Sequence, residues 1–129
     1  MTTEERPLSP HFTIYRWPIT MTLSILHRIT GVALSAGLVL FVAWLSAIAW
    51  PALPYEGLAR FFGGTFGKLL LLGWSFSFFL HLANGVRHLV WDTGRLLEKS
   101  AADATAWVVI VAAVLMTAAL WMSLQGGAG

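Results

Sequence analysis

The strongest candidate for chemistry is a row of polar residues in the apolar stretch of residues 68–91. His81, Gly85, His88 and Asp92 follow one another at steps of four, three and four, so a helix places them on one stripe. His81 lies about ten residues from the nearer end of this stretch, which is roughly 15 Å deep at 1.5 Å per residue. An ionisable side chain near mid-bilayer is costly, so His81 is a functional candidate.

The surroundings of His81 favour a haem ligand over a structural histidine. Neutral imidazole is a common axial ligand, Gly85 leaves room for a porphyrin, and cationic groups nearer the membrane surface suit the propionates. His27 and His88 lie nearer the surface, so a six-coordinate haem would take its second ligand from a partner subunit. The alternative is a neutral His81 that is hydrogen-bonded to a neighbouring helix.

A second polar cluster lies in the first apolar stretch. Ser24, His27, Arg28 and Gly31 have the spacing i, i+3, i+4 and i+7, which places them on one helix face. A hydroxyl and a guanidinium at the edge of the hydrocarbon suit a quinone head group, whose carbonyl oxygens accept hydrogen bonds while its tail stays in lipid. The alternative is that His27 and Arg28 are interfacial anchors that reach the lipid head groups.

The two clusters are expected to meet at one membrane face. The second helix would run antiparallel to the first, so its C-terminal residues Arg87, His88 and Asp92 return to the side on which the first helix begins. We therefore predict that both clusters form a single polar site.

The elements that carry these residues are predicted to be transmembrane helices. The 129 residues are 57% hydrophobic and only 11% charged, and this charged fraction is far below that of a typical soluble domain. Spans of about 20 apolar residues are predicted at about 22–50, 68–91 and 104–124. The predicted class is an all-α membrane protein with three transmembrane helices. Residues 1–19 would form a cytoplasmic N-terminal segment and residues 20–129 a single membrane anchor domain.

Breaks between the spans come from proline and from charge. Pro51 and Pro54 end the first span, and a short connection leads to Lys68. Charged residues between 92 and 103 predict a loop before the third span. The first ten residues contain acidic residues and prolines, unlike a signal or transit peptide, so we expect the first span to be retained.

Charge and composition set the orientation and exclude some functions. The N-terminal side carries more cations than the opposite side, which has Arg60 and Lys68, so the N-terminus is predicted to be cytoplasmic. The cations on the N-terminal side are Arg6, Arg16, Arg28, Arg87, Arg95 and Lys99. Without cysteine the chain cannot hold a cysteine-ligated iron–sulfur cluster, and its net charge of +2 gives no basic stripe for nucleic acid.

Three segments resemble the cytochrome b556 subunit family of succinate dehydrogenase. This subunit is the larger of the two small membrane anchors of respiratory complex II. The three segments are Arg6-Pro7-Leu8-Ser9-Pro10-His11 with Ile14-Tyr15-Arg16, then Ser24-Ile25-Leu26-His27-Arg28-Ile29-Thr30-Gly31, and His81 with Gly85-Val86-Arg87-His88 and Asp92-Thr93-Gly94. The resemblance implies that His81 is an axial ligand of one haem b, with His27, Arg28 and His88 in the propionate region. It also implies that Ser24 and Arg28 line a ubiquinone site.

The resemblance further implies a multi-subunit complex of the alphaproteobacterial and mitochondrial branch, and the lack of a transit-peptide pattern favours a bacterial inner membrane. Its other members would be a flavoprotein that oxidises succinate, an iron–sulfur subunit on the cytoplasmic face, and a second small anchor that shares the haem. Two alternatives stay open from the sequence. One is an anchor of a fumarate reductase, and the other is a non-redox transporter or assembly subunit whose histidines form a proton path.

Overall fold

The computed structural model describes residues 16–50 and 55–127, so most of the predicted N-terminal segment and the first family motif lie outside the described residues. The described chain forms four helices: α1 (Ile19–Ala49), α2 (Tyr55–Gly63), α3 (Thr65–Asp92) and α4 (Lys99–Gly126). Within these ranges three helices, α1, α3 and α4, are long and apolar enough to cross a membrane. The predicted all-α class with three transmembrane helices is confirmed.

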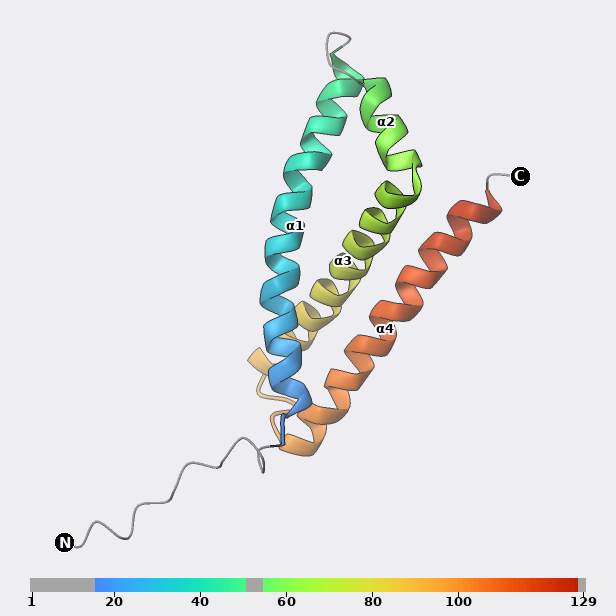
Figure 1. The fold of residues 1–129 in the computed structure, drawn as a ribbon. Coiled ribbons are helices and arrows are strands. Elements are labelled where there is room, and N and C mark those ends of the chain that lie inside the picture. Colours follow the sequence, from blue (N-terminus) through green and yellow to red (C-terminus); the bar gives the residue numbers. More distant parts are fainter. Residues whose placement is uncertain (1–15, 51–54, 128–129) are drawn as a thin grey trace, which may run out of the picture.

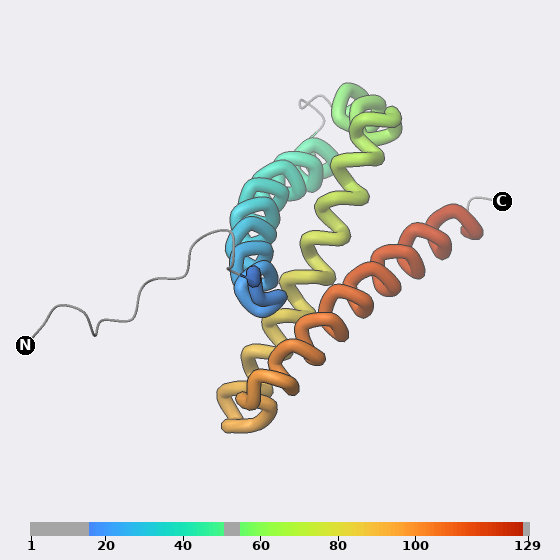
Figure 2. Tube along the Cα trace, turned by 60° about the horizontal axis from the view of Figure 1, so that its bottom comes forward, coloured from blue at the N-terminus to red at the C-terminus, as the bar shows by residue number. Residues whose placement is uncertain are grey.

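The three long helices alternate in direction (Figure 1). The start of α1, the end of α3 and the start of α4 lie together at one end of the molecule, which we call the site end. The short helix α2 lies at the opposite end and leads the chain back into α3. In Figure 2 α4 diverges from α1 and α3 toward its C-terminus. One contact still joins α4 to α3 near that end, where Nε1 of Trp121 donates to Oγ of Ser75 at 3.0 Å.

Small and branched apolar residues form the core between the long helices. Leu23 of α1 and Leu80 of α3 are fully buried, and they pack with residues of the buried face of α4. The buried residues of α4 are Ala106, Val109, Ala113 and Thr117. Their short side chains allow the backbones to approach closely, which is how helices pack in a membrane where burial from water gives no driving force.

The structure differs from the sequence prediction at two connections. The segment between the first two spans was predicted as a short connection, but it contains the nine-residue helix α2. The charged loop before the third span was predicted to reach residue 103, but α4 already begins at Lys99. Both predictions relied on polar and helix-breaking residues, and neither charge nor glycine prevents a helix outside the hydrocarbon layer.

Candidate functional site

Three histidines meet at the interface between α1 and α3. The rings of His27 and His81 are stacked, with 3.9 Å between centroids and an angle of 8° between their planes. His88, two turns after His81 on α3, meets His27 edge-on with 5.2 Å between centroids. We call His27, His81 and His88 the histidine cluster. The structure therefore brings together residues from both predicted polar clusters.

The hydrogen bonds of His81 identify its tautomer. Nδ1 of His81 lies 3.2 Å from the carbonyl oxygen of His27 and 3.2 Å from Oγ1 of Thr30. A carbonyl oxygen can only accept a hydrogen bond, so Nδ1 must carry the ring proton. Nε2 then holds the free lone pair, and it makes no hydrogen bond within the described part of the chain. This nitrogen is available to bind a metal ion.

Two glycines have different roles around His81. A Cβ added at Gly31 of α1 would lie 3.2 Å from Cε1 of His81, so the absence of a side chain allows the imidazole to pack against α1. A Cβ added at Gly85 would meet nothing within 4 Å. Gly85 follows His81 by one turn on the same stripe of α3. His81 is therefore closely packed against α1 at Gly31, whereas the surface of its own helix is open at Gly85.

Ser24 and Arg28 lie one turn apart on α1, and both are exposed. Neither side chain makes a hydrogen bond among residues 16–50 and 55–127, and they take no part in the ring contacts of the histidine cluster. A shallow hollow of about 440 Å³ lies beside Arg28 and is otherwise lined by Ile29, Val32 and Ala33. This part of α1 therefore presents a cation at the rim of an apolar hollow.

Arg87 does not join the polar site, so the prediction that it meets the first helix is wrong. Its guanidinium instead reaches α4, where Nε donates to Oγ1 of Thr105 at 3.0 Å and Nη2 donates to the carbonyl oxygen of Ala102 at 2.9 Å. Arg87 is only 6% exposed, and Cζ lies 3.9 Å from the ring centroid of Trp91. Successive helix residues point about 100° apart, so His88 can face α1 while Arg87 faces α4.

Two further polar residues of α3 have positions that the sequence did not predict. Asn84, to which the sequence assigned no role, is fully buried, and its Oδ1 accepts a hydrogen bond of 3.3 Å from Nη1 of Arg87. Asp92, predicted to lie in the polar site, is the exposed last residue of α3. The buried polar contacts near the end of α3 therefore connect it to α4 and not to Ser24 and Arg28.

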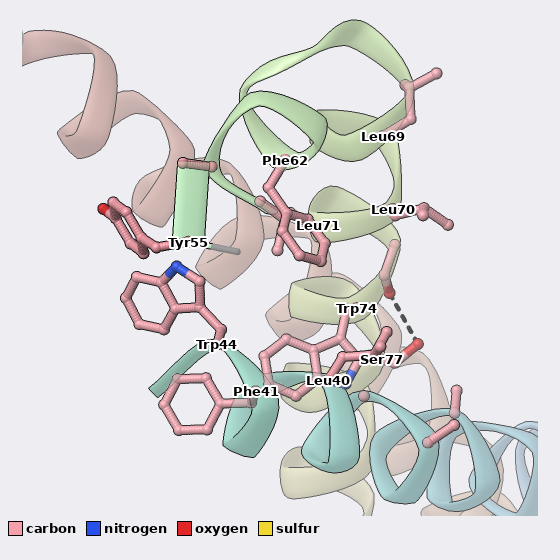
Figure 3. A pocket seen from close by; sticks show the side chains of 15 residues that line it. Leu40, Phe41, Trp44, Tyr55, Phe62, Leu69, Leu70, Leu71, Trp74 and Ser77 are labelled. Carbon is pink, nitrogen blue, oxygen red and sulfur yellow. Dashed lines mark hydrogen bonds between the residues drawn. The ribbon is translucent and has the colours of Figure 1, made fainter. Parts of the chain in front are cut away.

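A larger apolar hollow opens farther from the site end (Figure 3). It has a volume of about 860 Å³ and lies between α1, α2 and α3, with the rings of Trp44, Tyr55, Phe62 and Trp74 among its walls. Its lining reaches Ser77, which is one turn of α3 before His81 and donates its hydroxyl to the carbonyl oxygen of Gly73. Such a lining suits an apolar or flat aromatic group.

Sequence reasoning missed Thr30, which is buried and contacts His81 directly. Threonine is common in membrane helices and often bonds to its own helix backbone, so the residue type alone did not indicate a contact with His81. The available signal was its position, three residues after His27 and beside Gly31 on the face that meets α3.

An all-α chain with three membrane-spanning helices and a histidine cluster between two of them defines a multi-pass membrane protein with a candidate site inside its helix bundle. Residues 2–120 match the succinate dehydrogenase/fumarate reductase transmembrane subunit family, and the chain belongs to that family.

Individual relatives support this membership. The chain is 39% identical over 118 residues to the succinate dehydrogenase cytochrome b556 subunit of Rickettsia felis, with 92% of each chain covered. Identity to the subunit of the same name from Rickettsia bellii is 43% over the same length and coverage. The chain is also 41% identical over 119 residues to the mitochondrial succinate dehydrogenase cytochrome b560 subunit of Sus scrofa. This alignment covers 89% of the present chain and 69% of the relative.

The family predicted from the three motifs is confirmed, and the chain is a membrane anchor that forms part of an enzyme complex. The family description covers anchors of both succinate dehydrogenase and fumarate reductase. The relatives described above are named as succinate dehydrogenase subunits, which favours that assignment over the fumarate reductase alternative. A non-redox transporter or assembly subunit is not consistent with this membership.

Proposed function

We propose that this chain is the haem b-binding anchor of a succinate:quinone oxidoreductase and that Nε2 of His81 is one axial ligand of the haem iron. The observation that carries the proposal is the contact between Nδ1 of His81 and the carbonyl oxygen of His27, because it leaves Nε2 unprotonated and free. When bound, haem b supplies a one-electron redox centre within the membrane.

Other residues around His81 fit the same cofactor. Gly85 leaves open space beside the ligand, and the larger apolar hollow begins one turn away at Ser77. Nδ1 of His27 is buried and has no hydrogen-bond partner in the described part of the chain, so it could bond to a propionate. His88 and Arg28 lie toward the site end and complete the proposed propionate region.

The second axial ligand is assigned to a second small anchor subunit that shares the haem. Among residues 16–50 and 55–127 the only histidines are the three of the cluster; the ring of His27 stacks directly on that of His81, and His88 lies two turns nearer the site end on α3. Much of the apolar surface of the three spans is exposed in the single chain, which leaves large faces for lipid and for that anchor. The flavoprotein and iron–sulfur subunits would dock at the site end.

Ubiquinone is the proposed electron acceptor, held by Ser24 and Arg28. Both side chains are exposed on one face of α1, and the shallow hollow beside Arg28 has the apolar lining that the first part of a quinone tail requires. The hydroxyl can donate a hydrogen bond to a quinone oxygen, and the guanidinium favours its anionic reduced stages. The complex would lie in a bacterial inner membrane with the site end and the N-terminus cytoplasmic.

The test is the haem spectrum of the assembled complex with His81→Ala. Loss of the low-spin haem b signal is expected, with the flavin content of the purified complex reporting whether assembly has survived. Leu82→Ala is a matched control because Leu82 is the next residue of α3 and is 48% exposed. A His81→Ala complex with the haem content and low-spin spectrum of the parent would overturn the assignment.

A further inference from the structure

We propose that Thr30 is a positioning residue for the haem ligand, acting on His81 through a hydrogen bond from the ring nitrogen that faces away from the iron. The inference rests on the proposed role of His81 and adds a residue to that site. Thr30 would hold the imidazole in one tautomer and one orientation, and it would increase the electron density that the ring donates through Nε2.

The direction of each hydrogen bond follows from the groups available. Oγ1 of Thr30 donates its proton to the carbonyl oxygen of His27 at 3.0 Å. The same Oγ1 lies 3.2 Å from Nδ1 of His81, so toward the imidazole it can only accept. The proton on Nδ1 is thus shared between the Thr30 hydroxyl and the His27 carbonyl, both at 3.2 Å.

The position of the hydroxyl is strongly restricted. Thr30 is 5% exposed, and a β-branched side chain in a helix has few rotamers. Its bond to the His27 carbonyl selects a rotamer that also presents the oxygen to His81. The ring plane is fixed independently by the stack on His27 and by the close approach at Gly31. Thr30 therefore adds a polar contact to a ring that packing already holds in place.

A hydrogen bond from Nδ1 has a known consequence for a metal-bound imidazole. An acceptor at Nδ1–H makes the ring a stronger donor, which stabilises the ferric state more than the ferrous state. Removing one of the two acceptors should therefore raise the midpoint potential of the haem. The His27 carbonyl would remain, so the haem should stay bound while its potential and its ferric spectrum change.

The competing interpretation is that the Thr30 hydroxyl only satisfies a carbonyl of its own helix. Thr117 of α4 provides the comparison, because it is 6% exposed and its Oγ1 donates to the carbonyl oxygen of Ala113 at 2.7 Å. Within the described residues Thr117 makes no contact with a histidine. If that interpretation were right, losing the buried hydroxyl at Thr30 and losing it at Thr117 should have the same effect on the haem.

The experiment compares Thr30→Val, Thr30→Ser and Thr117→Val in the complete purified complex. The readouts are haem content, the midpoint potential of haem b, and the electron paramagnetic resonance spectrum of the ferric state. Thr30→Val should retain haem, shift the potential in the positive direction and alter the ferric signal. Thr30→Ser should restore the parental values, and Thr117→Val should leave them unchanged.

Parental potential and ferric signal in Thr30→Val would overturn the inference, as would an equal shift in Thr117→Val. Haem loss in Thr30→Val but not in Thr30→Ser would support a required hydroxyl, whereas loss in both would overturn the inference in favour of a packing role. The His81→Ala complex separates this result from the proposed function. If His81→Ala retains the low-spin haem, the proposed function fails; if it loses haem while Thr30→Val is parental, only the role of Thr30 fails.

Discussion

The imidazole of His27 lies flat on that of His81, 3.9 Å away between ring centroids, and so joins the first and second spans at the candidate site. The carbonyl of His27 contacts the same ring at Nδ1, so one residue of α1 fixes both the plane and the tautomer of His81. The site consequently depends on the register between α1 and α3. Changes on α1 should alter the chemistry of a ligand carried by α3.

Gly31→Ala should disturb the candidate haem site through this packing. The added Cβ would lie 3.2 Å from Cε1 of His81, so the ring must move by a few tenths of an ångström or the helices must separate. We expect an altered ferric haem spectrum and reduced haem content. Gly126→Ala is the control, since its Cβ meets nothing within 4 Å and the residue ends α4, away from the histidine cluster. Equal spectra for both variants would contradict the prediction.

Gly85→Leu should reduce haem content without destabilising the helix bundle. A Cβ at this position meets nothing within 4 Å in the single chain, so we expect a side chain to conflict only with a porphyrin on the surface beside His81. The ratio of haem to flavin in the purified complex measures the effect, and the yield of assembled complex serves as the control. A parental ratio would place the porphyrin away from Gly85.

Arg87→Met should destabilise the anchor at the junction of α3 and α4. The guanidinium makes hydrogen bonds to Thr105 and Ala102 from a position that is 6% exposed. Hydrogen bonds to a charged group contribute about 1.5–3 kcal/mol each, so losing these two should lower the free energy of unfolding by about 3–6 kcal/mol and lower the Tm of the complex. Arg95→Gln, at an exposed position of the connecting loop, should leave Tm nearly unchanged. Equal Tm values for the two variants would contradict this role.

The site end is predicted to face the cytoplasm. Arg16, Arg28, Arg95 and Lys99 lie toward this end, whereas Arg60 belongs to α2 at the other end. Reporter domains fused to the two termini should show a cytoplasmic N-terminus and an external C-terminus. The reverse result would separate the histidine cluster from any cytoplasmic iron–sulfur donor.

The sequence was sufficient to predict the spans and to select His81 as a candidate ligand, because both depend on local properties. Apolar length identified α1, α3 and α4, and the depth of His81 within the second apolar run made it exceptional. The direction of Arg87 and the contact made by Thr30 depend instead on how the helices are rotated against one another. That rotation is set by Gly31, by the small residues of α4 and by other packing between distant residues, which periodicity alone does not determine.

The quinone assignment gives the remaining prediction. Ser24 and Arg28 share one exposed face of α1, whereas the histidine cluster faces α3, so Ser24 can be altered without changing the proposed haem site. Ser35 is a suitable control for Ser24, because it is exposed on α1 and its hydroxyl donates to the carbonyl oxygen of Gly31. Arg95 is the control for Arg28.

Ser24→Ala and Arg28→Leu should each lower kcat/KM for ubiquinone by roughly 10-fold or more, as expected for the loss of one hydrogen bond or charge that acts on the substrate. Succinate oxidation with an artificial acceptor that takes electrons from the soluble subunits should stay near normal. Ser35→Ala and Arg95→Leu should leave both activities unchanged.

If Arg28 served only the haem propionates, Arg28→Leu would change the haem spectrum and leave the quinone kinetics intact. Parental KM and kcat in both Ser24→Ala and Arg28→Leu would remove the quinone site from this face of α1, and a deficit in one alone would assign the contact to that residue.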